Sequence, residues 1–195
     1  MNNDFYSFVK KNGNLITTAQ AVNIGVSKTT LTNYVAKGEL TRVNHGIYAL
    51  PDTVIDDMYV LRLRNQHIVF SHESALFLNG LSERTPFIHS ITTPSNTVLP
   101  ASIKKECACF YVRPKLFDMG LEMRNTTFGN AVYCYNVERT ICDILRSRSR
   151  MDEETVIAAI KNYAAFPQKN LYHLYEYAEK FSVLPLIKKY MEVLT

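Results

Sequence analysis

The sequence has no apolar run of the ~18 residues that a helix needs to cross a bilayer. Its first residues, Met-Asn-Asn-Asp, have neither the basic region nor the apolar stretch of a secretory signal. No two of its four cysteines form a C-x-x-C pair, which favours buried thiols over disulfides in a cytosolic chain. We therefore expect a cytoplasmic protein without a membrane partner. The cysteines are Cys107, Cys109, Cys134 and Cys142.

The motifs of several enzyme classes are also missing. There is no H-E-x-x-H, no Walker A loop, no G-x-G-x-x-G and no Gly-Ser dyad of the kind found in many nucleotidyltransferases. The Ser-His-Glu-Ser run at residues 71–74 lacks the elbow of a catalytic nucleophile and is interpreted as helix capping. Cys107 and Cys109 would share one face of a strand, but no second ligand pair has zinc spacing. The sequence thus predicts no catalytic residue, no metal site and no cofactor.

The positive charge is concentrated at the start of the chain. The net charge is +4, and residues 1–50 hold five lysine and arginine residues against two acidic ones. Residues 51–195 hold the other 17 basic and 16 acidic side chains, so they are almost neutral. An excess of this kind suits a face that binds phosphates. The apolar content of 47% predicts a globular core and not disorder.

The first fifty residues alternate short amphipathic helices with clear stops. Asp4 can cap a first helix, and Thr17 begins a T-x-x-Q capping box. Ser27 can cap a third helix, and Gly25 can adopt the positive φ of a sharp turn before it. The pattern predicts three helices and two strands, at residues 4–12, 17–24, 27–37, 40–43 and 47–50. This is the order of a winged helix-turn-helix, which Pro51 would close.

The third helix divides into two faces at a period of 3.6 residues. Leu31 and Val35 point inward, while Asn33 points outward with an amide that can pair with adenine in bidentate fashion. Thr29 and Thr30 lie near the helix N-terminus, where recognition helices meet bases. The alternative is a small helical subdomain with a polar surface. The predicted DNA-contacting residues are Ser27, Lys28, Thr29, Thr30, Asn33, Tyr34, Lys37, Arg42, Asn44 and His45.

Other basic side chains can add phosphate contacts, which give affinity without sequence information. Arg139 is not counted among the predicted phosphate contacts, because Asp143 lies four residues further along its helix and can pair with it. Residues 146–150 form a basic loop that suits DNA phosphates, RNA or an acidic partner, or that is simply a solvated loop. The predicted additional phosphate contacts are Lys10, Lys11, Arg146, Arg148 and Arg150.

Residues 52–195 are predicted to form one α/β domain after a winged helix-turn-helix domain at residues 1–51. We expect a small mixed or antiparallel sheet and several helices, so the fold class is mixed α+β. Helices should begin after the caps Ser71, Asn136 and Asp152. Further helices are expected at 57–66, 168–180 and 183–194, and strands at 87–93, 107–112, 121–127 and 131–135.

Seven segments of the chain carry a family resemblance. They are LITT at 15–18, GVS at 25–27 with Leu31, GELTRV at 38–43, GIYALP at 46–51, SHESAL at 71–76, NGL at 79–81 and VERTICD at 137–143. Together they resemble the AbiEi-type antitoxins of the AbiE abortive-infection systems, a type IV toxin–antitoxin family of bacteria.

The resemblance implies a DNA-binding antitoxin that represses its own operon and acts in phage defence. Such a protein binds inverted repeats in its promoter through the winged domain. Through its C-terminal domain it counteracts a nucleotidyltransferase-type toxin, without forming a stable complex with it. No residue of this sequence is assigned to neutralisation, and the operator sequence and the oligomeric state on DNA stay open.

Two other functions fit the same elements. One is a winged-helix repressor whose α/β domain senses a small ligand, in which case a ligand would weaken DNA binding. The other is an enzyme with a DNA-targeting module, such as a nuclease, although the sequence shows no carboxylate–lysine cluster for cleavage. A toxin-like reading frame directly downstream would favour the antitoxin.

Overall fold

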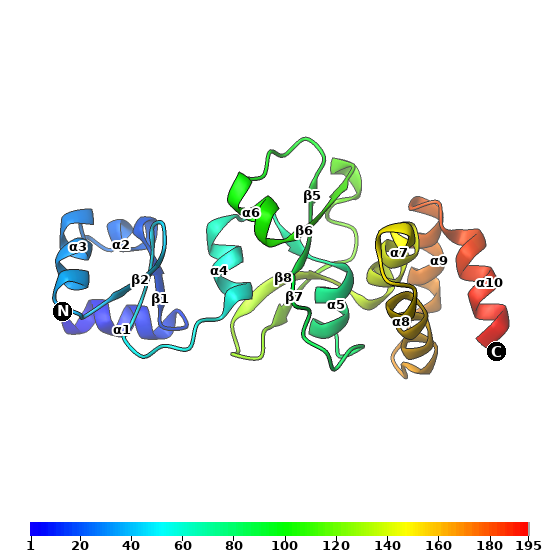
Figure 1. Ribbon diagram of the computed structural model, residues 1–195, viewed down its shortest axis with the longest axis horizontal. Helices are drawn as coiled ribbons and strands as arrows, with labels where there is room; N and C mark the ends of the chain where they lie inside the picture. The colour runs from blue at the N-terminus through cyan, green and yellow to red at the C-terminus, as the bar shows by residue number, and fades with distance from the viewer. Residues whose placement is uncertain (195) are drawn as a thin grey trace. The chain divides into compact units, whose positions relative to one another are not determined.

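The protein forms two compact units in a computed structural model that describes residues 1–194 (Figure 1). The first unit contains Met1–Arg64 and the short segment Thr127–Asn130, and the second contains the remaining chain. The first unit runs past Pro51 because Val60, on the helix that follows, packs against the apolar side of the small sheet. The functional boundary at residue 51 stays a prediction.

The first unit has a helix-turn-helix followed by a β-hairpin, the wing. Its elements are α1 (Asn3–Lys11), β1 (Leu15–Thr17), α2 (Thr18–Asn23), α3 (Lys28–Ala36), β2 (Thr41–Asn44), β3 (Ile47–Ala49) and α4 (Asp57–Arg64). The strands form an antiparallel sheet in the order β1-β3-β2. Strand β1 was not predicted, because a strand of three residues offers too short a pattern to be distinguished from a loop.

The helix caps of the first unit follow local sequence with one exception. Thr17 and Gln20 form the predicted capping box, and Ser27 accepts a hydrogen bond from the backbone N–H of Thr30. The predicted cap at Asp4 is wrong. Asn2 takes that place, since its side-chain oxygen accepts from the N–H of Asp4 at 2.7 Å. Asp4 lies instead in the first turn, where its charge favours the helix dipole.

A small apolar core holds α1, α2 and α3 together. Its fully buried members are Phe5, Val9, Ile16, Ala21, Leu31, Leu40 and Leu50. Burial of such side chains contributes ~1.5–3 kcal/mol each, which exceeds what the short helices could gain from propensity. The core therefore positions α3, and with it the outward face of α3.

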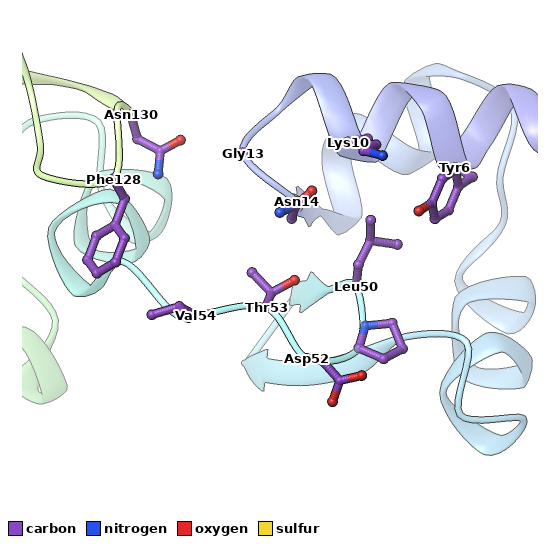
Figure 2. A pocket seen from close by; sticks show the side chains of 11 residues that line it. Tyr6, Lys10, Gly13, Asn14, Leu50, Asp52, Thr53, Val54, Phe128 and Asn130 are labelled. Atoms are coloured by element: carbon purple, nitrogen blue, oxygen red, sulfur yellow. The ribbon is translucent and has the colours of Figure 1, made fainter.

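A pocket of about 530 Å³ also belongs to the first unit (Figure 2). It is lined by α1, by the connection after β3 and by the turn at Phe128 and Asn130. Lys10 is the only basic residue among its lining side chains, and Asp52 the only acidic one. This lining offers no cluster of charges for an ionic ligand, and we assign none to it.

The second unit is a mixed sheet with helices. Its elements are β4 (Val69–Phe70), α5 (His72–Leu78), β5 (Ser90–Pro94), α6 (Ala101–Glu106), β6 (Ala108–Val112), η1 (Pro114–Leu116), β7 (Leu121–Asn125), β8 (Ala131–Tyr135), α7 (Val137–Arg146), η2 (Arg148–Arg150), α8 (Glu153–Ala165), α9 (Leu171–Lys180) and α10 (Leu184–Leu194). The strand order is β6-β5-β4-β8-β7, with parallel pairs β5–β6 and β4–β8 and antiparallel pairs β4–β5 and β7–β8. The predicted mixed α+β fold is confirmed.

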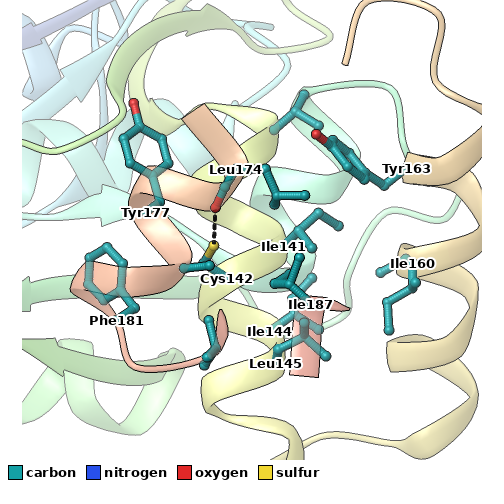
Figure 3. Packing of buried hydrophobic residues seen from close by; sticks show 14 of the residues in the cluster. Ile141, Cys142, Ile144, Leu145, Ile160, Tyr163, Leu174, Tyr177, Phe181 and Ile187 are labelled. Carbon is teal, nitrogen blue, oxygen red and sulfur yellow. Dashed lines mark hydrogen bonds between the residues drawn. The ribbon is translucent and has the colours of Figure 1, made fainter. Parts of the chain in front are cut away.

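The C-terminal helices pack around α7 (Figure 3). Ile141, Ile144 and Leu145 of α7 are buried, as their inward positions predicted. Their neighbours include Ile160 of α8 and Leu174 of α9. Since every residue of α7 from Val137 to Leu145 is buried, this helix is the centre of the second unit. Within the described chain, no helix is both long and apolar enough to cross a bilayer.

Several local expectations for the second unit are wrong. The strand expected from residue 87 begins at Ser90, and Phe87 is fully exposed. Residues 148–150 form a turn of 3₁₀ helix instead of an open loop. Ser71 precedes α5 but makes no side-chain cap, because its hydroxyl oxygen accepts a hydrogen bond from Thr92 at 2.8 Å. Strand β4 and helix α6 were not predicted, since elements of two and six residues carry little periodicity.

Candidate nucleic-acid interface

The outward face of α3 is built by its position on the core of the first unit. Leu31 is fully buried and Val35 packs against the same core, so the predicted inner face is confirmed. The opposite side chains are exposed to solvent. They are Lys28, Thr29, Thr32, Asn33, Ala36 and Lys37, the last being the C-cap residue. Such an exposed polar face is what a recognition helix needs to enter the major groove.

Asn33 and Thr29 are uncharged polar side chains of this face that are available to a ligand. They lie four residues apart on α3, and both are exposed. Within the described part of the chain, neither side chain makes a hydrogen bond to another residue. Their donors and acceptors are therefore held on a rigid helix with no internal partner to give up on binding.

Other predicted residues of the helix are used partly in building it. The hydroxyl of Ser27 accepts from the N–H of Thr30 at 3.1 Å and lies 2.9 Å from the hydroxyl of Thr30. Tyr34 is half-buried, and its ring stacks on Phe5 with 5.5 Å between centroids. These three predicted residues thus lie at the margin of the exposed face or serve its cap. Thr32 and Ala36 were missed, although the spacing from Lys28 could have placed both on this face.

The wing carries the remaining predicted side chains of the first unit. Arg42 and His45 are exposed, and a guanidinium nitrogen of Arg42 lies 3.2 Å from Nδ1 of His45. The side-chain oxygen of Asn44 accepts from the N–H of His45 at 2.7 Å. The pairing of β2 and β3 shifts between Arg42 and Asn44, so a bulge sets the direction in which these side chains leave the hairpin.

The tip of the wing is attached to the start of α2. The N–H of Thr18 donates to the carbonyl oxygen of Gly46 at 2.8 Å, and the Thr18 hydroxyl donates to the same oxygen at 3.3 Å. Gly46 has a φ of +71°, and a Cβ there would lie 3.3 Å from the Thr18 hydroxyl oxygen. Glycine is therefore the residue that suits this close approach best, and the approach orients the wing relative to the helix-turn-helix.

The predicted additional cations are distributed over both units. Lys10 and Lys11 are exposed in the last turn of α1. In the second unit Arg146 is paired with Asp143 at 3.2 Å, whereas Arg148 and Arg150 are exposed. Their guanidinium groups are nevertheless anchored. Arg148 donates to the carbonyl of Leu145, and Arg150 donates to the carbonyl of Cys109 and lies over the ring of Phe110.

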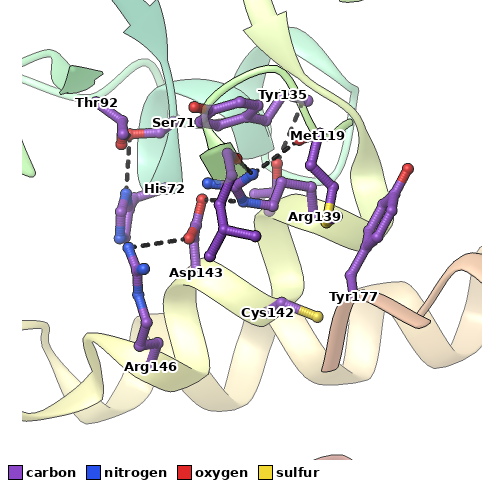
Figure 4. Close-up of polar contacts among 12 residues, drawn as sticks. Ser71, His72, Thr92, Met119, Tyr135, Arg139, Cys142, Asp143, Arg146 and Tyr177 are labelled. Carbon is purple, nitrogen blue, oxygen red and sulfur yellow. Dashed lines mark hydrogen bonds and ion pairs between the residues drawn. The ribbon is translucent and has the colours of Figure 1, made fainter. Parts of the chain in front are cut away.

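A buried ion pair lies at the centre of the second unit (Figure 4). Nε of Arg139 donates to Asp143 at 2.9 Å, and both side chains are completely buried, which confirms the predicted pair. A second guanidinium nitrogen of Arg139 donates to the carbonyls of Leu116 and Met119. The rings of Tyr135 and Phe181 lie 4.0 and 3.9 Å from the guanidinium carbon. This arginine therefore joins α7 to the segment before β7 and is not available to a ligand.

His72 is also an internal residue. It is fully buried, stacks on Phe110 at 3.5 Å and contacts the hydroxyls of Ser71 and Ser147 through its two ring nitrogens. Burial lowers the pKa of His72 to about 4, although the charge of Asp143 acts in the opposite direction. The ring is therefore neutral near pH 7, and its bonds join α5 to the segment after α7. Since Ser71 makes no side-chain cap either, the interpretation of the Ser-His-Glu-Ser run as helix capping is wrong.

The cysteines lie mainly in the interior of the second unit. Cys107, Cys134 and Cys142 are buried, as expected, and Cys109 is half-buried on β6. Burial raises the pKa of Cys134 to about 12 and raises the pKa of Cys142 as well. Thiols in this state are poor nucleophiles. Among the described residues, no group of three histidine, cysteine or acidic side chains could hold a metal ion.

Comparison with known proteins finds a matching family within the first unit and a similar fold over most of the chain. Residues 6–51 match a family described as "Transcriptional regulator, AbiEi antitoxin", which confirms the resemblance for the helix-turn-helix and its wing. No curated protein matches the chain. The crystal structure of the RV2827C protein from Mycobacterium tuberculosis is similar in fold, with a TM-score of 0.62 at 13% sequence identity. The likeness covers 90% of this chain and 70% of that one.

Proposed function

We propose that this protein is a DNA-binding antitoxin that represses transcription of its own toxin–antitoxin operon in abortive infection, a form of phage defence. The observation that carries the proposal is the exposed face of α3, where Asn33 and Thr29 have no partner among the residues that the structure describes. The family match over residues 6–51 supports the same function. In this proposal the protein binds double-stranded DNA at inverted repeats upstream of the operon.

The proposed interface keeps the residues predicted from the sequence and orders them by exposure. Asn33 and Thr29 read bases, because their polar atoms are free on the outward face. Lys28 and Lys37 contact phosphates. The wing contributes Arg42, Asn44 and His45, while Ser27, Thr30 and Tyr34 lie at the margin of the contact. Lys10, Lys11, Arg146, Arg148 and Arg150 are proposed as further phosphate contacts.

The second unit is proposed to counteract a nucleotidyltransferase-type toxin, without a stable complex and without catalysis of its own. Two features support a non-enzymatic role. The histidine of the Ser-His-Glu-Ser run is buried and neutral, and three of the four thiols are buried. These groups hold the interior of the unit together, and none of them faces an open site where a substrate could react.

A gel-shift titration tests the DNA-binding part. The full chain is titrated on the DNA directly upstream of its gene and on a scrambled duplex of equal length, at near-physiological salt. We expect a preference of ~10³-fold or more for the upstream DNA. Asn33→Ala should reduce this preference, whereas Asn96→Ala, a matched change at an exposed asparagine of the second unit, should not. Equal binding to both duplexes by the unaltered chain would refute the autorepressor.

A growth assay tests the antitoxin part. The gene directly downstream is induced in bacteria, with and without the full-length protein under a separate promoter. We expect growth to stop when the downstream gene is expressed alone and to recover with the protein. Rescue should persist in the Asn33→Ala variant, because neutralisation is assigned to the second unit. A downstream gene that is harmless, or toxicity that the protein does not relieve, would refute this assignment.

A further inference from the structure

We propose that α3 reads A·T base pairs, with an adenine opposite Asn33 and thymine methyl groups opposite Thr32 and Ala36. The inference rests on the proposed function, since it assumes that α3 enters the major groove. It adds the base composition of the contacted site, which neither the fold nor the family match provides.

The outward face of α3 has short side chains at its centre and lysines only at its ends. The exposed positions follow the helix repeat: Lys28 and Thr29, then Thr32 and Asn33, then Ala36 and Lys37. Short side chains let the helix backbone approach the base edges closely. The helix contains no arginine, the side chain that most often makes the specific bidentate contact to guanine.

The hydroxyl of Thr32 is already used inside the helix. It donates to the carbonyl oxygen of Lys28 at 3.1 Å, so its hydrogen is not available to a base. Thr32 therefore offers the groove its methyl group and an oxygen that can only accept, and Ala36 offers a second methyl group one turn further along. Contacts between such groups and the C5-methyl of thymine distinguish A·T pairs in the major groove.

Asn33 supplies the hydrogen-bonding group on the same outward face of α3. Its amide is exposed and has no partner within the described residues, so both its donor and its acceptor are available. The paired donor and acceptor match the N6 amino group and N7 of adenine, whereas guanine presents two acceptors at this edge. An amide between two methyl groups is thus complementary to adenine and thymine.

The two lysines are placed for the DNA backbone and not for guanine. Lys28 and Lys37 are nine residues apart, which corresponds to ~13.5 Å along the helix axis. The major groove is ~12 Å wide, so a helix of this length that lies in the groove can bring the lysines at its ends to the phosphates at the groove edges. The lysines therefore supply affinity from phosphates and leave the base reading to the centre of α3.

Selection from a duplex library with a randomised segment tests the inference with the full-length protein. We expect enriched sites in which the base pairs under α3 are A·T. In these sites, replacement of thymine by uracil, which lacks only the methyl group, should weaken binding severalfold. Asn33→Ala should weaken binding to the enriched site by roughly 5- to 150-fold.

Thr32→Ser separates the methyl contact from folding. It keeps the hydroxyl and removes the methyl group, so the variant should bind equally to duplexes that carry thymine or uracil at the pair opposite Thr32 alone, while its thermal unfolding midpoint is unchanged. Thr127→Ser, at an exposed threonine outside α3, should retain the difference. Enriched sites with G·C pairs under α3, or binding that uracil does not weaken, would overturn the A·T assignment alone. A library without any enriched site would overturn DNA recognition itself, and the assignment with it.

Discussion

The two units of this protein place their polar side chains in opposite ways. In the first unit the polar groups of α3 lie outside, and Asn33 has no partner within the described chain. In the second unit Arg139, Asp143 and His72 are completely buried, and each is bonded to its neighbours. Exposed polar groups on a packed helix are free for binding, whereas buried ones hold the fold. The same residue chemistry is therefore available for binding in one unit and holds the interior together in the other.

This difference also changes how the family resemblance is interpreted. The similar segments of the first unit include the wing and the turn before α3, which face solvent in part. The similar segments of the second unit, at 71–76 and 137–143, are mostly interior. The family match covers residues 6–51 alone, so the resemblance of these later segments stays a prediction, and their buried side chains identify no residue that would act on a toxin.

The largest expected effect is on the buried ion pair. Arg139→Met leaves the carbonyls of Leu116 and Met119 without their donor. It also leaves Asp143 with Arg146 as its remaining ion-pair partner. We expect the free energy of unfolding to fall by about 3–5 kcal/mol, as is typical when one partner of a buried pair is removed. Urea denaturation followed by circular dichroism measures the loss.

The control for this variant replaces both members of the pair. Arg139→Met together with Asp143→Leu should be more stable than Arg139→Met alone, because no buried carboxylate then depends on the missing arginine. A single variant that loses less than ~1 kcal/mol would show that the pair is not central to the unit.

The next expected effect is a pH dependence that comes from His72. Its folded pKa of about 4 lies below the ordinary value of 6.5, so between these values the unfolded chain binds the additional proton. The stabilisation is complete above pH 6.5 and is lost as the pH falls towards 4, by roughly 3 kcal/mol in total. Unfolding free energies measured at intervals between pH 7 and pH 4.5 should show this slope.

His72→Gln isolates the contribution of the ring from that of the carboxylates. Glutamine keeps hydrogen-bonding groups but does not titrate, so the variant should be less stable at pH 7 and should lose less stability on acidification. Equal pH slopes for the two proteins would contradict a neutral, buried imidazole at this position.

A smaller effect is expected at Asn33, on the free energy of DNA binding, and it should be confined to the specific site. Asn33→Ala should cost ~1–3 kcal/mol of binding on the true site and little on random DNA. Because the side chain is exposed and unpaired, its removal should change the free energy of unfolding by less than ~0.5 kcal/mol. Equal losses on specific and random DNA would remove Asn33 from base reading.

The smallest expected effect is on the salt dependence of DNA binding. Each phosphate contact that is lost should flatten the slope of log K against log salt by ~0.9. Lys28→Ala and Lys37→Ala should each do so, whereas Lys161→Ala, at an exposed lysine of α8, should not. Arg148→Ala combined with Arg150→Ala tests the second unit. A slope that stays unchanged would exclude Arg148 and Arg150 from the DNA interface.

Local sequence predicted the first unit well because its signals are local. The Thr17 capping box, the Ser27 cap and Gly25 with a φ of +85° each depend on residues within one or two turns. The cap at Asn2 is not distinguished from Asp4 by sequence, because both residue types can cap a helix, and only the backbone geometry at Asn2 decides between them.

The second unit was predicted in outline, but its interior was not. The helix after Asn136 and its pair Arg139–Asp143 follow from a spacing of four residues. The contacts of His72 with Ser147 and with Phe110 join residues 75 and 38 positions apart, and no local pattern contains them. A histidine beside serines looks the same in a sequence whether it caps a helix, catalyses a reaction or is buried.

The sequence by itself determined the order of the helices, the turn before α3 and the polar face of α3, because these depend on propensity, capping and the 3.6-residue period. Only the tertiary structure decided which polar residues are exposed and which are internal. That choice depends on long-range packing, which gives a buried polar group its partners and leaves an exposed one free to bind DNA.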